Sequence, residues 1–504
     1  EPINLIIYLN HPTMPLSKLN YLDIGPGGTF NPSGNPGYDS IPQDVDDLFD
    51  DLQAKDQKKI LLYFHGGLVG EEDAMSSAIL ITEKLINETD VHPIAFIWET
   101  DLLSTIKQNL GNITSSDFFK KLLEKVIKVA GDKLGLDVNT LVGKRGIGNL
   151  TDAEIQLELQ KEAPFENYTQ NAATRSVNIL SGDDNTLRDE IEASIQDEIA
   201  GDPDFSSALI ASLTPAQLHL INQDKVISVP RPGQRGILSL AKIITAAITV
   251  IFKVIKRFVN KRDHGFYPTV MEEIFREVYI ADIGTTLWGF MKTKANDMWL
   301  PDPAGTTGLD QHAGRYLLSQ LKTYSGANPG VTIDLVGHSA GAIAICNFLR
   351  EFLDMGIDAK VRNIIFMAPA CRSDLFADTI GQHPDAFQNF RMFTMSDQYE
   401  CLDRCVPYVY TRSLLYMISG ILEKDEFDAY ILGMQRYLSG NPPYAADPKL
   451  QANINFMAAP PNRIVYAVTA AGAAPGLQCT AQHHGDFHDD QYLTMDSIVY
   501  ILNH

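Results

Sequence analysis

The sequence VTIDLVGHSAGAIAICNFLR, residues 331–350, combines a strand pattern, a turn motif and a helix pattern in one continuous stretch. Val331 to Val336 is an apolar run typical of a buried strand, and Ala342 to Arg350 has the pattern of a helix. Between them, Gly337-His338-Ser339-Ala340-Gly341 matches G-x-S-x-G, the motif of a nucleophile elbow. Its two glycines allow strand and helix to crowd around a strained serine, whose hydroxyl is lifted clear of the sheet. The motif alone is common by chance, but this context predicts that Ser339 is a catalytic nucleophile, with a structural turn serine as the alternative.

The flanking sequence repeats the alternation of strand and helix. Lys59 to Phe64 is a short apolar strand candidate, a helix pattern follows over 74–88, and Pro93 to Trp98 is the next strand candidate. The pattern resumes with helices over 269–299 and 310–324, strands over 361–368, 390–395 and 463–469, and a closing helix over 489–502. Residues 3–9 are a further apolar strand candidate. Such repeats predict an α/β fold with a parallel sheet and crossover helices.

Two insertions interrupt this pattern. Residues 103–267 contain helical segments and polar loops without strand alternation, which predicts an inserted helical cap or lid. A second, smaller insertion covers 401–461. The catalytic domain is therefore expected to comprise residues 1–102 and 268–504.

Composition excludes some classes of protein. With 504 residues, 45% hydrophobic and 21% charged, the chain is globular and could form several domains or one enlarged domain. A net charge of −22 argues against nucleic-acid binding, which needs a basic face. Five cysteines are too few, and odd in number, for a disulfide framework, which slightly favours the cytoplasm. The chain starts at Glu1 rather than at methionine, which is compatible with a removed signal or tag, so the compartment stays open.

One part of the large insertion is basic and apolar. Lys225 to Arg262 contains nine Lys or Arg residues and no acidic residue. Within it, Ile237 to Val259 places its polar residues at three- and four-residue steps, or multiples of them, and so forms a narrow polar stripe on an apolar helix. This pattern is typical of a helix that binds a membrane surface, although the apolar run between Lys242 and Lys253 is too short to span a bilayer. The alternative is a cap helix packed against its neighbours.

A nucleophilic serine needs a base, and in chain order the histidine should come last. His484 lies in a loop between the last strand and the closing helix, directly before Gly485, which gives it freedom to point toward the elbow. We therefore expect His484 to be the base, with His483 second and His488 as a residue that begins the last helix.

The base needs a carboxylate to orient it, and the oxyanion needs backbone N–H donors. Asp397 follows the strand over 390–395 and is the expected acid, while Asp374, which follows the preceding strand, is the alternative. One oxyanion donor should be Ala340, and the other should be Gly67 or Leu68 in the loop after the early strand. His65 is expected to brace that loop. No cofactor motif and no convincing metal cluster is visible, so no cofactor is expected.

With its matching residues His65-Gly66-Gly67, Gly337 to Gly341, Asp397 and His484-Gly485, the chain resembles α/β-hydrolase fold enzymes of the serine esterase and lipase type. The resemblance covers roughly residues 1–102 and 268–504. It implies an eight-stranded, mostly parallel sheet flanked by helices and a serine acyl-enzyme mechanism. The oxyanion loop has two glycines rather than the longer glycine run of one esterase branch, and the cap matches no subfamily.

The expected function is hydrolysis of a carboxylic ester, of a lipid or another hydrophobic acyl group. Ser339 would attack the carbonyl, His484 would take its proton and later activate water, and Asp397 would orient the imidazole. An amidase or peptidase with the same triad is the first alternative, since the triad does not determine the leaving group. The second alternative is a binding module on the same fold without catalysis.

Overall fold

The protein is built on one sheet of seven parallel strands. The computed structural model describes residues 16–67, 70–98, 102–138, 150–170, 183–200, 202, 204–205, 207–208, 235–279, 285–460 and 462–504. The strands are β1 (Tyr21–Ile24), β2 (Lys59–Phe64), β3 (His92–Trp98), β6 (Thr332–His338), β7 (Lys360–Met367), β8 (Phe387–Met395) and β9 (Ile464–Ala467), in the order β1-β3-β2-β6-β7-β8-β9. Every pairing between neighbours is parallel. The α/β class and the mostly parallel sheet are confirmed.

The expected strand count of eight is wrong for the part of the chain that the structure describes, where the sheet has seven. The strand candidate at residues 3–9 lies outside the described residues. The edge strand β1 was not predicted, because it has only four residues and a buried aspartate, Asp23, interrupts its apolar pattern.

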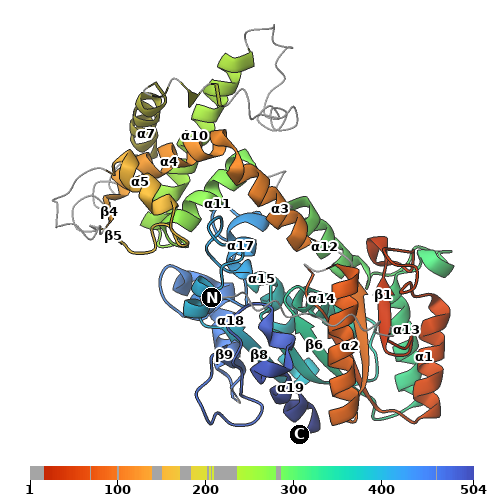
Figure 1. The fold of residues 1–504 in the computed structure, drawn as a ribbon. Coiled ribbons are helices and arrows are strands. Elements are labelled where there is room, and N and C mark those ends of the chain that lie inside the picture. The colour runs from red at the N-terminus through yellow and green to blue at the C-terminus, as the bar shows by residue number, and fades with distance from the viewer. Residues whose placement is uncertain are drawn as a thin grey trace, which may run out of the picture.

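Helices cover both faces of the sheet (Figure 1). On one face, α2 (Glu71–Glu88) and α19 (Thr494–Asn503) pack their apolar residues against Leu61, Tyr63 and Val336. On the other face, α1 (Pro42–Ala54), α13 (Ala313–Ala327) and α14 (Gly341–Asp354) pack against alternate strand residues such as Leu62 and Phe64. Strands buried on both faces have continuous apolar sequences, which is why they were predictable.

The inserted region forms a helical body beyond one end of the sheet (Figure 1). It contains α3 (Leu102–Ser115), α4 (Asp117–Leu134), α5 (Asp152–Leu159), α7 (Asp184–Ala200) and α10 (Arg235–Val259), and α11 (Phe266–Val278) packs against α10 and α4. It also contains a short antiparallel pair, β4 (Leu136–Val138) and β5 (Tyr168–Gln170), where only helices were expected. Strands of three residues carry too little alternation to be recognised.

Helix α10 packs against its neighbours over its C-terminal half. Ile251 and Ile255 are completely buried, whereas Ile244 and Ile248 are partly buried. Lys253 forms an ion pair with Glu277 and Lys256 with Asp184. Arg257 pairs with Glu272 and Glu273 in the interior.

This packing favours the cap-helix interpretation, because paired lysines offer little attraction to anionic lipid and buried isoleucines cannot insert into a membrane. Across the described residues, the structure contains no helix with the length and apolar character needed to cross a bilayer.

The second predicted insertion, 401–461, lies between the sheet and the cap. After α16 (Asp397–Leu402) it contains α17 (Leu414–Met417), followed by a helical turn over Ile418–Leu422 that contacts α11. It ends with α18 (Pro448–Ala458), which packs against α15 (Ser373–Phe376). This region determines which side chains reach the carboxyl ends of β6 and β8.

Candidate active site

The sharp turn at Ser339 is held by contacts that only glycine allows. Strand β6 ends at His338, Ser339 has a positive φ of 52°, and α14 begins at Gly341. A Cβ atom at Gly341 would lie 2.2 Å from the carbonyl oxygen of Phe64, and one at Gly337 would lie 2.7 Å from Cδ1 of Ile345. The predicted strand, turn and helix are confirmed, and the left-handed φ of a non-glycine residue here is a local strain.

Hydrogen bonds fix both sides of the Ser339 backbone. Its N–H donates to the carbonyl of Met367 at 2.8 Å, and its carbonyl accepts from the N–H of Ala370 at 2.9 Å. Both partners belong to the end of the neighbouring strand β7 or the residues just after it. These two bonds anchor the strained backbone of Ser339 to the end of β7, in addition to its connection with α14.

Ser339 and His484 line the same cavity, which has a volume of about 290 Å³. Other residues around it are His65, Gly66, His338, Asp403, Leu414 and His488. The Oγ of Ser339 and both ring nitrogens of His484 are buried and have no hydrogen-bond partner within the described chain. A serine hydroxyl and an imidazole that face one cavity with unused hydrogen-bonding capacity can exchange a proton once substrate closes the geometry.

The loop after β2 lies directly against the elbow. A Cβ atom at Gly66 would be 3.3 Å from Cβ of Ser339, and one at Gly67 would be 2.8 Å from Cβ of Ala340. The structure therefore brings Gly67 and Ala340 together, as the oxyanion prediction requires. Ala340 also precedes the first turn of α14, where backbone N–H groups lack carbonyl partners within the helix. Leu68, the other predicted donor, lies outside the described residues.

Four histidines, His65, His338, His484 and His488, surround the serine, and burial lowers the pKa of each of them. The Nδ1–H of His65 donates to the carbonyl of Gly66 at 2.6 Å, and its Nε2 accepts from the N–H of Trp98 at 3.0 Å. His65 therefore braces the loop, as expected. Burial lowers the pKa of His65 to about 4, and burial together with nearby His488 lowers the pKa of His484 to about 4. A neutral His484 at pH 7 can accept a proton from the serine.

The imidazole of His338, next to the serine, supports the loop that carries His484. Its Nε2–H donates to the carbonyl of His484 at 3.0 Å, and the two ring centroids are 5.1 Å apart. Its ring also lies 5.4 Å from that of His488. His338, the residue directly before the serine in the G-x-S-x-G motif, thus connects the elbow to the loop that carries His484 and His488.

Neither predicted acid lies in this cavity. The carboxylate of Asp397 accepts a hydrogen bond from the hydroxyl of Tyr416 at 2.7 Å and lines a different cavity. The carboxylate of Asp374 forms an ion pair with Arg372 at 2.9 Å. The structure therefore does not bring Asp397 to His484, because the helix that begins at Asp397 directs its carboxylate toward Tyr416.

Asp403, which the sequence analysis did not consider, does line the serine cavity. Its Oδ2 accepts a hydrogen bond from the backbone N–H of His484 at 2.8 Å, and burial raises the pKa of its carboxyl group. The available signal was its position beyond β8, after the nucleophile and before the histidine. Asp397 satisfies the same criterion, so chain order alone could not separate the two.

Comparisons with protein-family models, curated proteins and solved structures gave no match. Among the described residues, no group of three or more His, Cys, Asp or Glu side chains is placed to hold a metal ion.

Proposed function

We propose that this protein is a serine hydrolase of the α/β-hydrolase type that cleaves a small carboxylic ester through an acyl-enzyme on Ser339. The observation that carries the proposal is the strained, anchored Ser339, which shares a cavity with His484. Among the described residues, neither its Oγ nor the imidazole of His484 has a hydrogen-bond partner. The contact of Gly67 with Ala340 supports it, since two backbone N–H groups are needed where the oxyanion forms.

The reaction would follow the serine acyl-transfer scheme. Ser339 Oγ attacks the ester carbonyl while His484 takes its proton, and the oxyanion is held by the N–H groups of Gly67 and Ala340. The imidazolium then protonates the leaving alcohol, and the acyl group stays on Ser339. Water attacks this acyl-enzyme with His484 as the base, which releases the carboxylic acid and regenerates the serine.

The size of the cavity narrows the substrate class. A volume of about 290 Å³ lies at the lower limit of ordinary ligand pockets, which begin at roughly 300 Å³. This favours an ester with a short acyl chain over a long-chain lipid. Asp403 would act as a positioning residue, because its carboxylate holds the backbone of His484 and places a negative charge near the imidazolium that forms during the reaction.

A fluorophosphonate probe tests the proposal, because it reacts only with an activated serine. We expect the wild type to be labelled and Ser339→Ala to be unlabelled and to lose turnover of p-nitrophenyl acetate by about a millionfold. Ser77→Ala is the matched control, since Ser77 lines the same cavity without lying at the elbow, and it should keep both labelling and turnover.

Esters of increasing acyl length should show a steep fall in kcat/KM beyond short chains. Labelling that persists in Ser339→Ala, or a wild type that neither labels nor turns over any ester, would contradict a serine hydrolase. If the protein cleaves amides but no esters, Ser339 remains the proposed nucleophile and the proposed substrate class changes from esters to amides.

A further inference from the structure

A second and larger cavity, of about 720 Å³, lies where the chain passes from the cap into α11. Residues 261–265, between α10 and α11, form one side, and α16, α17 and the segment around Arg436 form the other. We call it the Arg436 cavity. The segment 397–416 separates it from the serine cavity, because Asp397 and Tyr416 line the Arg436 cavity while Asp403 and Leu414 line the other.

Among the described residues, the hydrogen-bond partners of the Arg436 guanidinium are all neutral. Its Nη1 donates to the hydroxyl of Tyr416 at 3.2 Å, and its Nη2 donates to the hydroxyl of Tyr444 at 3.0 Å and to the carbonyl of Asp263 at 2.8 Å. Its Nε is buried without a partner within the described chain. The rings of Tyr416, Tyr437 and Tyr444 lie 5.5–5.8 Å from the guanidinium and add to these dipoles. Within the described chain no carboxylate bonds to it directly, which favours an anion beside it.

Three basic residues, Lys261, Arg412 and Arg436, and two acidic ones, Asp263 and Asp397, line the cavity. Arg412 is already paired with Glu166 at 3.0 Å, so Lys261 and Arg436 are the cations that could meet a ligand. The carboxylate of Asp263 accepts from the N–H of Gly265 at 3.0 Å. The hydroxyl of Tyr416 accepts from Arg436 and donates to Asp397, so this acid reaches the guanidinium only through a tyrosine.

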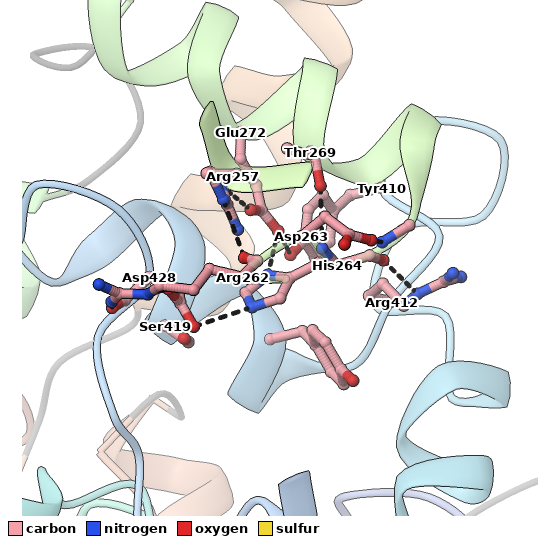
Figure 2. Close-up of polar contacts among 12 residues, drawn as sticks. Arg257, Arg262, Asp263, His264, Thr269, Glu272, Tyr410, Arg412, Ser419 and Asp428 are labelled. Carbon is pink, nitrogen blue, oxygen red and sulfur yellow. Dashed lines mark hydrogen bonds and ion pairs between the residues drawn. The ribbon is translucent and has the colours of Figure 1, made fainter. Parts of the chain in front are cut away.

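The wall formed by residues 261–265 is rigid, as Figure 2 shows for the contacts around His264 and Arg262. The Nδ1 of His264 bonds to Glu272 at 2.8 Å, and the guanidinium of Arg262 pairs with Asp428 at 2.5 Å. Gly265 has a φ of +95°, and a Cβ there would lie 2.6 Å from Nη2 of Arg412. A wall that is already held by such contacts loses little conformational entropy when a ligand binds.

We propose that the Arg436 cavity is a binding site for a small organic anion, an aromatic ring that carries a phosphate or carboxylate group. The oxyanion would accept from the guanidinium of Arg436 and lie near Lys261, and the rings of Tyr416, Tyr444 and Tyr466 would contact the aromatic part. This site does not involve Ser339, so a failure to bind the anion and a failure to hydrolyse esters are independent results.

Titration calorimetry of the intact protein with phenyl phosphate and with benzoate tests the site and distinguishes the two oxyanions. We expect one of them to bind, and Arg436→Gln to weaken that binding by at least about tenfold, because a charged hydrogen bond is lost. Arg391→Gln is the matched control: its Nε is also buried without a partner within the described chain, but it lines a different cavity. This variant should bind within about twofold of the wild type, because the sites are independent.

A second variant keeps the test decisive if Arg436→Gln folds poorly. Asp397→Asn removes the negative charge of the cavity while its side-chain oxygen can still accept from Tyr416. It should therefore tighten binding by about threefold, an increase that misfolding cannot produce. The proposal is overturned if neither anion binds the wild type, if Arg436→Gln and Arg391→Gln bind alike, or if Asp397→Asn weakens binding.

Discussion

His65 uses both ring nitrogens in the neutral form, so protonation of this residue destabilises the folded protein. Protonation of Nε2 would place a donor against the N–H of Trp98. Burial lowers the pKa of His65 from 6.5 to about 4, and the pKa of His484 shifts equally. Between these values the unfolded chain binds protons that the folded chain does not. Stability is therefore complete above about pH 6.5 and falls as the pH drops to about 4, by up to about 3 kcal/mol for each residue.

Urea unfolding at pH 7.5 and at pH 4.5 measures this loss. His65→Gln should lower the stability at pH 7.5 and reduce the difference between the two pH values, because the titrating group is gone. His383→Gln, at an exposed histidine, should leave the difference unchanged. An identical pH dependence in the wild type and in His65→Gln would show that His65 is not the group responsible.

Replacing each candidate carboxylate by an amide identifies the acid of the proposed triad. Asp403→Asn should lower kcat/KM for p-nitrophenyl acetate by about tenfold or more, because the imidazolium of His484 loses a nearby negative charge. Asp397→Asn should change it by less than about twofold, since that carboxylate bonds to Tyr416 in the other cavity. The reverse result would restore Asp397 as the orienting acid.

Residue-level prediction succeeded where the motif is local and failed where the path of the chain matters. Ser339, Gly67 and Ala340 meet because a strand, a turn and a loop after the neighbouring strand determine their positions. His484 reaches the same cavity, as chain order suggested. The choice between Asp397 and Asp403 depends on how residues 397–416 fold between the sheet and the cap, which no local pattern encodes.

Among the elements, the long strands and α2 were predictable, while α10 was ambiguous. A wide apolar arc with a narrow basic stripe is produced equally by a membrane-surface helix and by a buried cap helix. The acidic partners that distinguish them, Asp184, Glu272 and Glu277, lie on other helices. They are 15 to 72 residues away along the sequence from the basic residues of α10 that they bind, so the helix's own pattern could not reveal them.

The close approach of α14 to β2 depends on Gly341. Since a Cβ there would meet the carbonyl oxygen of Phe64 at 2.2 Å, Gly341→Ala must push the helix away from the strand. We expect a loss of about 2–3 kcal/mol in the free energy of unfolding, measured by urea denaturation. Gly289→Ala in α12 (Thr285–Asp297) is the control, because nothing lies within 4 Å of its added Cβ. It should be neutral or stabilising by up to about 1 kcal/mol, and equal losses in both variants would refute the contact.

At the scale of the molecule, the cap and the sheet share one hydrophobic core. A single cluster of buried residues runs from Leu62 and Phe64 in the sheet to Ile251 and Ile255 in α10. A buried polar network lies within the same region: Glu272 contacts Arg257 at 2.6 Å, His264 at 2.8 Å and the hydroxyl of Tyr410 at 2.6 Å (Figure 2). Arg257 and His264 belong to the cap and Tyr410 to the second insertion, 401–461, so the carboxylate of Glu272 links these two regions by hydrogen bonds as well as by packing.

This arrangement predicts that cap and sheet unfold together. Glu272→Ala leaves Arg257 and His264 without their shared carboxylate in a fully buried site, which should cost about 3–5 kcal/mol. Lys253→Gln removes an ion pair whose two side chains are each 25% exposed, so it should cost less than about 1 kcal/mol. Calorimetry should show a single unfolding transition in the wild type and in both variants. The midpoint temperature should fall strongly in Glu272→Ala and only slightly in Lys253→Gln. A separate early transition of the cap, with the sheet melting unchanged, would show that the shared core does not make the two parts one cooperative unit.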